Sequence, residues 1–381
     1  MSSPVRLLIL VSSTGSGGAE RMAITLANQL VQRVSMRFVT GRIGALHQNI
    51  DPAVEVIDLD VSRMRYALRP LRRLLREWSP TVVFAPQVDA SMLLALAWRL
   101  AGRPGVLILR ESNYRSGQAR MRFLSSTSLI LRWAYHQALC VVAPARAIAE
   151  DLEAIHRLDR NRIKTIHNPI DLPHIREQAA GTKGETHIKP KNPPTEFKLI
   201  SVGRLVRQKG FDLLLPAFAF ALKNTSLINM SLTIIGDGPE RLHLERLIDQ
   251  LDLGSSVHIP GVTANPYTLI AQADFFVLSS RWEGFPNAMV EAMSLGVPPV
   301  AYRCPGAITE IIEHSQSGLL CEPESVESLG AALAHVSCDF QLREHLSNGA
   351  TERAKAFDAI EIAEKYLELF NSTSLRTGVS C

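Results

Sequence analysis

Two glutamates, Glu283 and Glu291, flank the start of an expected helix, and their spacing is the feature of the sequence most indicative of a binding site. Pro286 followed by Asn287 predicts a helix entry with Asn287 as the N-cap, so that Glu283 precedes the helix and Glu291 lies in its first turns. Free backbone N–H groups around Asn287 to Met289 would attract phosphate. A diphosphate therefore fits here, with carboxylates that accept hydrogen bonds from ribose and sugar hydroxyls. A solvated helix start with favourably placed acids is the alternative.

A second group of residues carries the complementary charge. A short apolar strand at Leu199–Val202 is followed by a loop between Gly203 and Gly210 that contains Arg204 and Lys209. Arginine forks onto phosphate oxygens and lysine adds a compact charge, so the pair can neutralise a diphosphate leaving group without a metal. Two exposed cations without a ligand are the alternative interpretation.

A glycine-rich loop follows the first expected strand, Val5–Val11. It runs Gly15-Ser16-Gly17-Gly18-Ala19-Glu20-Arg21. Because glycine has no Cβ, the backbone here can approach phosphates or an acceptor closely. The spacing does not fit the G-x-G-x-x-G fingerprint, since Glu20 stands where the third glycine would be, and this weakens a dinucleotide-binding interpretation.

Taken together, these segments resemble the retaining glycosyltransferases of family 4. The resemblance rests on four motifs in order: the glycine-rich loop, Gly203-Arg204 with Lys209-Gly210, the Gly-Asp-Gly-Pro segment at 236–239, and the E-x7-E pattern from Glu283 to Glu291. It covers nearly the whole chain. It implies an α/β GT-B fold, in which two Rossmann-like domains with parallel sheets face each other across a cleft.

The resemblance also implies roles for individual residues. Arg204 and Lys209 would stabilise the departing nucleoside diphosphate, and Glu283 would hold the donor sugar as a positioning residue rather than a covalent nucleophile. Retention would follow from front-face attack, in which a donor phosphate oxygen helps to deprotonate the acceptor. No metal and no cofactor are needed on this account. The expected donor contacts are Gly17, Gly18, Gly203, Gly284, Phe285, Pro286, Asn287, Ala288 and Glu291, the last binding the ribose.

One segment departs from the family pattern. Many relatives carry a histidine after a strand of the first domain, where this chain has Leu109-Arg110-Glu111-Ser112-Asn113. These polar side chains either take over acceptor or sugar contacts or are ordinary loop residues. The candidates for acceptor or sugar contacts are Gly15, Glu20, Arg110, Glu111 and Asn113.

The chain of 381 residues is long enough for two domains. We expect an N-terminal domain at 1–177, a polar linker at 178–196, a second domain at 197–347, and a C-terminal helix within 348–381 that crosses back to the first domain or merely caps the second. Alternating short apolar strands and amphipathic helices favour parallel sheets. Strands are expected near Leu7–Val11, Met36–Thr40, Val82–Ala85, Val106–Leu109, Leu139–Ala143, Lys198–Val202, Ser231–Ile235, Ser256–Ile259, Asp274–Leu278 and Pro299–Ala301.

Composition favours a cytoplasmic protein. The five cysteines are scattered, without C-x-x-C spacing, which argues against a disulfide framework or a zinc cluster. No stretch reaches the ~18 apolar residues that a membrane span needs, and the N-terminus lacks the features of a signal peptide.

The total charge of +4 hides an asymmetry. Residues 1–180 hold 24 Lys and Arg against 14 Asp and Glu, whereas residues 181–381 hold 17 against 23. Arginines are interleaved with apolar residues at 63–76 and at 115–132, a pattern that suits peripheral attachment to anionic lipid on the cytoplasmic face of the inner membrane. An ordinary charged surface is the alternative. No recognition helix, RNA-binding signature or zinc-finger spacing supports a nucleic-acid partner.

The expected function is transfer of a hexose or N-acetylhexosamine from a nucleotide-sugar donor to a growing glycan or lipid-linked saccharide in cell-surface polysaccharide synthesis, as in lipopolysaccharide. A UDP-sugar is the favoured donor and GDP-mannose its rival. The alternatives are a GT-B-like nucleotide-sugar epimerase and a noncatalytic nucleotide-sugar-binding protein.

Overall fold

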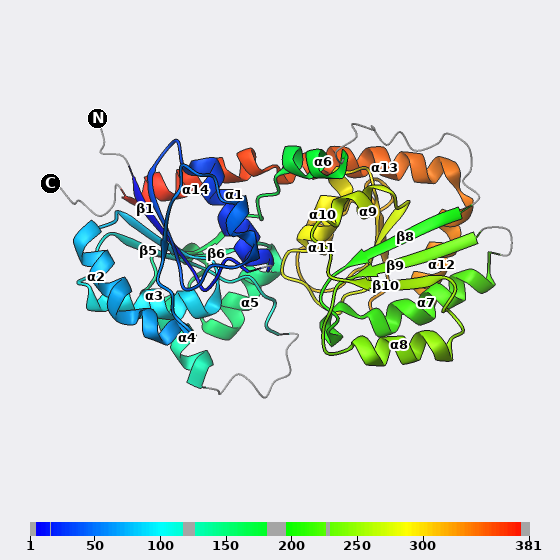
Figure 1. The fold of residues 1–381 in the computed structure, drawn as a ribbon, viewed down its shortest axis with the longest axis horizontal. Coiled ribbons are helices and arrows are strands. Elements are labelled where there is room, and N and C mark those ends of the chain that lie inside the picture. The colour runs from blue at the N-terminus through cyan, green and yellow to red at the C-terminus, as the bar shows by residue number, and fades with distance from the viewer. Residues whose placement is uncertain (1–4, 16, 117–125, 181–195, 226–228, 375–381) are drawn as a thin grey trace. The chain divides into compact units, whose positions relative to one another are not determined.

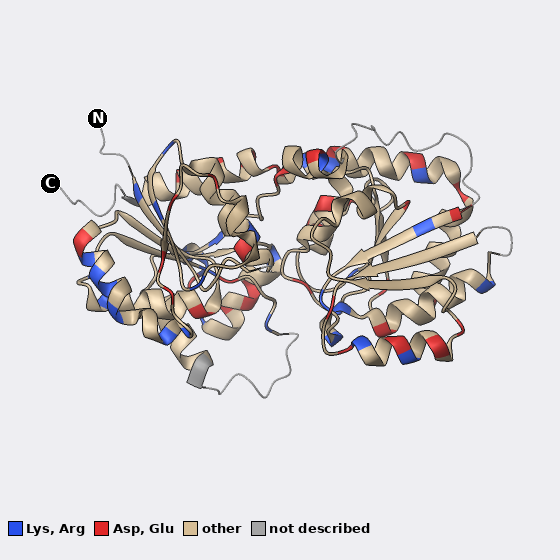
Figure 2. Ribbon diagram, viewed as in Figure 1, with Lys and Arg blue, Asp and Glu red and all other residues tan. Residues whose placement is uncertain are grey.

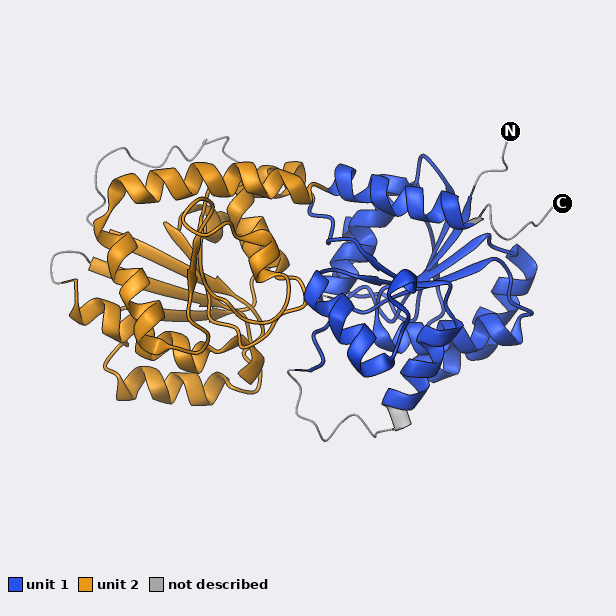
Figure 3. Ribbon diagram, turned by 180° about the vertical axis from the view of Figure 1, so that it is seen from behind, with its two compact units in different colours: residues 1–170, 359–381 blue, residues 171–358 orange. Residues whose placement is uncertain are grey.

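A computed structural model describes residues 5–15, 17–116, 126–180, 196–225 and 229–374 (Figure 1). The chain forms two compact units (Figure 3). Unit 1 contains Met1–Ile170 and Ala359–Cys381, and unit 2 contains Asp171–Asp358. The chain passes from unit 1 to unit 2 after Ile170 and returns after Asp358, whereas the first domain was expected to end at residue 177. Most of the expected linker, residues 181–195, lies outside the described residues.

Unit 1 is built on a parallel sheet of seven strands in the order β3-β2-β1-β4-β5-β6-β7. Its central strands are short, apolar and buried on both faces, as a parallel sheet covered by helices requires. The order of the first six strands is that of the Rossmann fold. The strands are β1 (Arg6–Val11), β2 (Ser35–Thr40), β3 (Glu55–Asp58), β4 (Val82–Ala85), β5 (Val106–Arg110), β6 (Cys140–Ala143) and β7 (Ile163–Thr165).

Helices cover both faces of this sheet (Figure 1). The last helix packs on the same unit as the first, because the rings of Tyr366 and Phe370 lie against that of Phe84 in β4 at centroid distances of 5.7 and 5.8 Å. Fully burying each such ring contributes roughly 1.5–3 kcal/mol to folding. The helices are α1 (Gly18–Leu30), α2 (Leu68–Trp78), α3 (Val88–Leu100), α4 (Ser126–Gln137), α5 (Arg146–His156) and α14 (Ala359–Ser374).

Unit 2 repeats the arrangement with six parallel strands in the order β10-β9-β8-β11-β12-β13. Counted from β8, this is again the Rossmann order. The strands are β8 (Glu196–Val202), β9 (Asn229–Ile235), β10 (Val257–Gly261), β11 (Phe275–Leu278), β12 (Pro299–Tyr302) and β13 (Leu319–Cys321). The helices are α6 (Leu172–Ala180), α7 (Phe211–Lys223), α8 (Arg241–Gln250), α9 (Tyr267–Ala271), α10 (Asn287–Ser294), α11 (Ile308–Ile311), α12 (Val326–Cys338) and α13 (Phe340–Ala354).

The strand order fixes where a ligand can bind in each unit. In an open parallel sheet, ligands bind beyond the carboxyl ends of the strands, where the strand order reverses. In unit 2 that point lies between β8 and β11, which pair directly. The loops leaving these two strands are Gly203–Gly210 and Ser279–Pro286, so the fold itself brings together the two motifs that carry Arg204, Lys209 and Glu283.

Three features differ from the sequence-based expectation. Strands β3, β7 and β13 were not expected, and each lies at the edge of its sheet. The segment 348–381, in which one C-terminal helix was expected, contains the end of α13 and all of α14. The extended backbone of Asp358 (φ −54°, ψ 140°) separates them after a 3-10 turn, η7 (Lys355–Phe357).

Candidate functional site

The side chains of Lys209 and Glu283 are in direct contact. Lys209 Nζ lies 2.6 Å from Glu283 Oε1, and Ser280 Oγ donates a second hydrogen bond of 2.6 Å to the same oxygen. The Glu283 side chain is 5% exposed and that of Lys209 20%. Because Oε1 already accepts two hydrogen bonds and no described residue donates to Oε2, the second oxygen is the one available to a ligand.

The loop that carries Lys209 is held against the Gly-Asp-Gly-Pro segment. Leu205 N donates to Asp237 O at 2.9 Å and Gly203 N to Ile235 O at 3.0 Å. Gly236 has φ +149°, and a Cβ there would collide with the Gly203 carbonyl. This glycine is therefore required for the two loops to pack, and the segment supports the Lys209 loop from behind.

The absence of a side chain at Gly203 leaves room for Lys209. A Cβ at position 203 would lie 3.2–3.4 Å from three methylene carbons of the lysine. The aliphatic stem of Lys209 therefore lies along the backbone of the loop while its ammonium group reaches Glu283. The neighbouring Arg204 is exposed, and within the described part of the chain its side chain forms no hydrogen bond or ion pair.

The backbone of Glu283 is fixed from the loop after β12. Glu283 N donates to Pro305 O at 2.9 Å, and Gly306, with φ +127°, approaches the Glu283 carbonyl so closely that a Cβ would collide with it. Cys304 is buried beside them. Burial, together with the charge of Glu283, raises the pKa of its thiol above the ordinary value, so this cysteine stays protonated and is not a nucleophile.

The start of α10 differs in detail from the expectation. Helical geometry begins at Asn287 and Pro286 is the capping position, so the prediction of Asn287 as N-cap was wrong by one residue. Asn287 N donates to Phe285 O and Met289 N to Pro286 O, each at 3.0 Å. Free amides were expected here, but these two are bonded, because the first turn closes on its own carbonyls.

The remaining predicted donor contacts surround this turn. Gly284 O accepts from Ala307 N at 3.2 Å, and the ring of Phe285 packs edge-on against Phe357 at 5.6 Å. Ala288 N donates to no residue of the described chain. Glu291 is 5% exposed and lies on the buried side of α10.

In unit 1 the glycine-rich loop follows β1, as the loop that carries Lys209 follows β8 in unit 2. Gly17 caps α1, and Glu20 in the first turn folds its carboxylate over Gly17. Thr14 ties the loop to the strand β2 exit, since its Oγ1 accepts a hydrogen bond of 2.7 Å from Gly44 N. Gln87 Oε1 accepts from Ser12 N at 2.6 Å. Gly15, Gly17, Gly18 and Glu20 are thus adjacent on one anchored loop.

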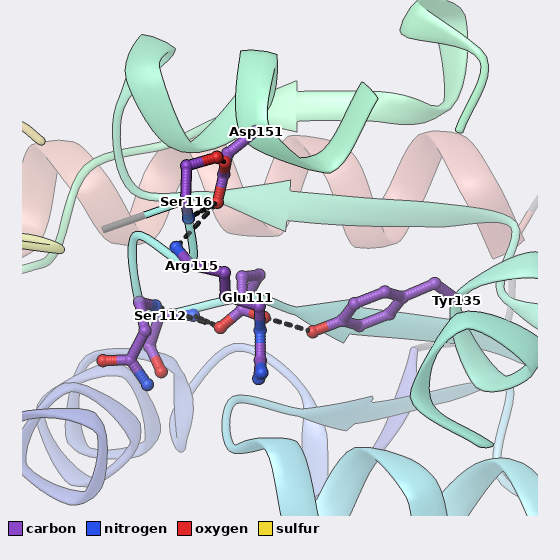
Figure 4. A network of polar contacts seen from close by, with 7 residues as sticks. Glu111, Ser112, Arg115, Ser116, Tyr135 and Asp151 are labelled. Atoms are coloured by element: carbon purple, nitrogen blue, oxygen red, sulfur yellow. Dashed lines mark hydrogen bonds and ion pairs between the residues drawn. The ribbon is translucent and has the colours of Figure 1, made fainter. Parts of the chain in front are cut away.

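The loop after β5 is organised by Glu111 (Figure 4). Its carboxylate accepts hydrogen bonds from the Ser112 and Asn113 amides at 2.9 and 3.0 Å, and from Tyr135 Oη at 3.0 Å, and it pairs with Arg115. Burial and the charge of Glu111 raise the pKa of Tyr135 well above its ordinary value, so the phenol remains a donor.

Arg110 and Glu111 are each 1% exposed. Arg110 donates to Asn168 Oδ1, and burial lowers the pKa of its guanidinium. Neither side chain offers surface to a ligand in this conformation, whereas Asn113 is exposed. Sequence reasoning placed all three in one group, but the structure separates two buried residues that shape the loop from one that points outward.

Sequence reasoning also missed residues that shape the site. Ser280, Tyr135 and Asp151 belong to these networks, and Asp151 accepts hydrogen bonds from the Arg115 amide at 2.7 Å and from Ser116 (Figure 4). Ser280 lies three residues before Glu283, so a hydrogen bond between the two side chains could have been proposed from the sequence. Tyr135, the distant partner of Glu111, lies 24 residues away in the chain, and no local pattern marks it.

A small hollow in unit 1 has a volume of about 280 Å³. It contains none of the predicted site residues. Among the described residues no three His, Cys, Asp or Glu side chains are grouped as a metal site would require. The hollow is lined by Ser128, Leu129, Arg132, Ala154, Ile155 and His156.

Comparisons with known proteins agree with this architecture. The family described as Glycosyltransferase Family 4 matches residues 16–173, and that described as Glycosyl transferases group 1 matches residues 182–353. The chain is 26% identical over 374 residues to a Campylobacter jejuni N-acetylgalactosamine-N,N'-diacetylbacillosaminyl-diphospho-undecaprenol 4-alpha-N-acetylgalactosaminyltransferase, covering 95% of this chain and 98% of that one. It is 27% identical to the lipopolysaccharide core biosynthesis glycosyltransferase LpsD of Rhizobium meliloti, covering 93% and 95%.

The fold also matches solved structures. The crystal structure of HepE from Anabaena in complex with UDP-glucose superimposes with a TM-score of 0.80 at 21% identity, covering 96% of this chain and 99% of that one. The two matched family segments span both units, and each unit has the Rossmann strand order. The chain therefore belongs to the family 4 glycosyltransferases and has their GT-B fold.

Proposed function

We propose that this glycosyltransferase moves a hexose or N-acetylhexosamine from a UDP-sugar to a hydroxyl of a lipid-linked or growing surface saccharide, with retention of the anomeric configuration. The observation that carries the proposal is the Lys209–Glu283 contact at the strand-order reversal of unit 2, beside the unpaired Arg204. Two cations for a diphosphate and one carboxylate oxygen that has no partner among the described residues, for a sugar hydroxyl, are the groups that this reaction needs.

In the proposed reaction, the bond between the anomeric carbon and the donor diphosphate breaks, and its electron pair goes to the diphosphate oxygen. The acceptor hydroxyl oxygen bonds to the anomeric carbon on the same face, and its proton passes to a donor phosphate oxygen. Negative charge grows on the diphosphate as the bond breaks, so Arg204 and Lys209 stabilise the transition state more than the ground state. Glu283 Oε2 orients the sugar, and Glu291 binds the donor ribose.

The remaining donor contacts in this proposal are carried by the backbone. Gly203, Gly284 and the turn Phe285–Ala288 border the diphosphate and sugar, and Gly17 and Gly18 stay proposed donor contacts. Asn113, Gly15 and Glu20 are the proposed contacts to the acceptor or sugar, while Arg110 and Glu111 hold the loop that presents Asn113. No metal takes part in this scheme, so activity should survive an excess of EDTA.

The identity of donor and acceptor rests on relatives. HepE binds UDP-glucose in its crystal structure, and the Campylobacter relative is named for transfer of N-acetylgalactosamine to a diphospho-undecaprenol saccharide. A UDP-sugar and a lipid-linked acceptor are therefore the first substrates to test, with GDP-mannose as the rival donor. The test is release of UDP from UDP-glucose, UDP-N-acetylglucosamine and UDP-N-acetylgalactosamine, with and without undecaprenyl-diphosphate-linked sugars, followed by determination of the anomeric configuration.

The same assay separates the alternatives. An epimerase would convert the nucleotide sugar without acceptor and without net release of UDP. A noncatalytic binding protein would bind UDP but show no turnover, and Glu283→Ala and Arg204→Ala would leave its cellular role intact. Acceptor-dependent release of UDP, lost in Glu283→Ala, would support the transferase.

We further propose that unit 1 attaches peripherally to anionic lipid at the cytoplasmic face of the inner membrane. Helix α2 buries Leu71 and Leu75 in the core and exposes arginines 69, 73 and 76. Basic positions are concentrated on this helix (Figure 2). Leu100 of α3 and Leu129 of α4 are also exposed, and α3 packs against both α2 and α4. No described helix combines the length and apolarity of a membrane span. Arg120 and Arg122 of the second basic segment lie outside the described residues.

Flotation with vesicles tests this attachment. The chain should float with phosphatidylglycerol vesicles and not with phosphatidylcholine vesicles, because the attraction is to surface charge. Reversing the charge of arginines 69, 73 and 76 to glutamate should abolish flotation, whereas reversing the exposed Lys223 and Arg246 of unit 2 should not. Flotation that survives the α2 variant would place the contact elsewhere.

A further inference from the structure

Three of the four residues after β11, Ser279, Arg281 and Trp282, bind the loop that carries Lys209. Arg281 N donates to Gln208 O at 2.8 Å, and Ser279 Oγ donates to Lys209 O at 3.0 Å. In the opposite direction, Gln208 Nε2 donates to Trp282 O at 2.9 Å. With Ser280 bound to Glu283, the segment Ser279–Trp282 joins the backbone on either side of Lys209 to the backbone that leads into Glu283.

The Arg281 side chain is the centre of this connection. Its Nη1 and Nη2 donate to the two carboxylate oxygens of Asp212 at 2.8 Å each, and Nη1 also donates to Arg207 O at 2.8 Å. Its Nε donates to Glu324 at 3.1 Å. Arg207 begins the 3-10 turn η6 (Arg207–Lys209) and Asp212 lies in the first turn of α7, so the guanidinium spans both ends of the Lys209 turn.

The chemistry of this contact favours rigidity. The Arg281 side chain is only 12% exposed, and a planar guanidinium bound to a carboxylate by two parallel hydrogen bonds has one allowed orientation. Although burial alone raises the pKa of Asp212, the hydrogen bond and charge of Arg281 hold that pKa below its ordinary value. The pair therefore stays ionised at neutral pH, and neither partner is free to bind a substrate.

We propose that Arg281 is a positioning residue for the transfer reaction, which fixes the Lys209 ammonium group beside Glu283 through its fork on Asp212 and the Arg207 carbonyl. The inference rests on the proposed function, since it assumes that Lys209 binds the donor diphosphate. The role proposed for Arg281 differs from that of Lys209, because Arg281 contacts neither Lys209 Nζ nor Glu283. It acts only through Arg207 O and the Asp212 carboxylate, which hold the 207–212 segment. A lysine ammonium on four flexible methylenes binds phosphate well only if its backbone is held in place.

The same unit offers a matched control. Arg241 also pairs with a carboxylate, Glu245, at 2.8 Å and donates to a backbone carbonyl, that of Ile259, at 3.0 Å. Its contacts join α8 to β10 and include no residue of the 207–212 or 279–283 segments. Nη1 also lies 3.9 Å from the Asp237 carboxylate, whereas Leu205 is held by the backbone carbonyl of Asp237 and not by its side chain. Arg241→Ala therefore removes a similar set of interactions without disturbing Lys209.

The experiment is a double-mutant cycle on the full-length protein between Arg281→Ala and Lys209→Met. UDP affinity is measured by titration calorimetry, kcat and KM for the donor are measured separately, and circular dichroism monitors folding. Arg281→Ala should weaken UDP binding roughly tenfold, mainly as a rise in donor KM, and Arg241→Ala should leave it unchanged. If Arg281 acts through Lys209, the double variant should bind UDP no more weakly than Lys209→Met alone.

Two further variants keep the test decisive if Arg281→Ala folds poorly. Asp212→Asn keeps the shape of the carboxylate but loses its charge and its second acceptor oxygen, and Arg281→Lys keeps the charge but loses the fork. Both should raise the donor KM in the same direction. Equal effects of the Arg281 and Arg241 variants, or additive effects of Arg281→Ala and Lys209→Met, would overturn the inference while leaving the transferase intact. Failure of the wild-type chain to bind a nucleoside diphosphate would instead overturn the proposed function.

Discussion

Ser280 and Lys209 bind the same oxygen of Glu283, each at 2.6 Å, and the other oxygen has no partner among the described residues. Replacing Ser280 by alanine leaves the lysine contact but frees the carboxylate to rotate. We predict that Ser280→Ala lowers kcat roughly tenfold, because Glu283 Oε2 no longer meets the sugar in one orientation. The measurement is steady-state transfer at saturating donor.

Ser294→Ala is the matched control for that variant. Ser294 is also buried and donates at 2.7 Å to the Glu291 carbonyl within α10, so its loss should cost about 1 kcal/mol of stability, as in Ser280→Ala. Equal kcat values for the two variants would show that Ser280 affects only the fold.

Arg204 is proposed to bind the donor diphosphate and not to support the fold. Its side chain is exposed and has no partner among the residues that the structure describes. We predict that Arg204→Ala leaves the melting temperature unchanged and weakens UDP binding roughly tenfold or more, since a charge-assisted hydrogen bond to phosphate is worth about 1.5–3 kcal/mol. Calorimetry at two salt concentrations is the check, because the contribution of an exposed charge shrinks with added salt. A lower melting temperature with unchanged affinity would contradict this assignment.

Gly306 sets the backbone of Glu283. Its φ of +127° is strained for any other residue, and a Cβ would collide with the Glu283 carbonyl. We predict that Gly306→Ala destabilises unit 2 by at least about 1–3 kcal/mol and abolishes transfer. Gly254→Ala, where a Cβ meets nothing within 4 Å, should be nearly neutral in both assays. Full activity in Gly306→Ala would show that the loop after β12 does not position Glu283.

Stability should depend on pH through His156. This residue is 2% exposed, and burial lowers its pKa to about 4, below the ordinary value of about 6.5. Between pH 4 and pH 6.5 the unfolded chain therefore binds more protons than the folded chain. The contribution of His156 to the free energy of unfolding is complete above pH 6.5 and is lost as the pH falls towards 4. At pH 5 the loss should be about 2 kcal/mol.

Denaturant unfolding of the wild type and of His156→Phe tests this pH dependence. The phenyl ring keeps the edge-on contact with Tyr135, which lies 5.1 Å from the imidazole between ring centroids. The difference in unfolding free energy between pH 7.5 and pH 5 should be smaller in the variant. Equal differences in the two proteins would mean that another group causes the change.

The sequence predicted the central strands of both sheets because they are apolar runs buried on both faces. The missed strands β3, β7 and β13 are edge strands of three or four residues, and β3 and β7 are partly exposed. An edge strand pairs on one side only, so it needs no long apolar run. The composition of Glu55–Asp58 therefore gave no sign of it.

The motif residues could be predicted, but their supports could not. The spacing of Glu283 and Glu291 and the glycines around Arg204 are visible in the chain. The contacts of Arg281 with Asp212 and of Glu111 with Tyr135 join residues 69 and 24 positions apart, which no periodicity marks. The burial of Arg110 and the closed first turn of α10 likewise depend on tertiary packing.

We propose above all that Arg204 and Lys209 bind the donor diphosphate, and titration of UDP into the full-length protein decides whether they do. We expect saturable one-to-one binding by the wild type and a loss of affinity of at least roughly a hundredfold in the Arg204→Ala, Lys209→Met double variant. Circular dichroism should show that this variant stays folded. Equal affinity of the two proteins for UDP would rule out a role of these two cations in binding the diphosphate.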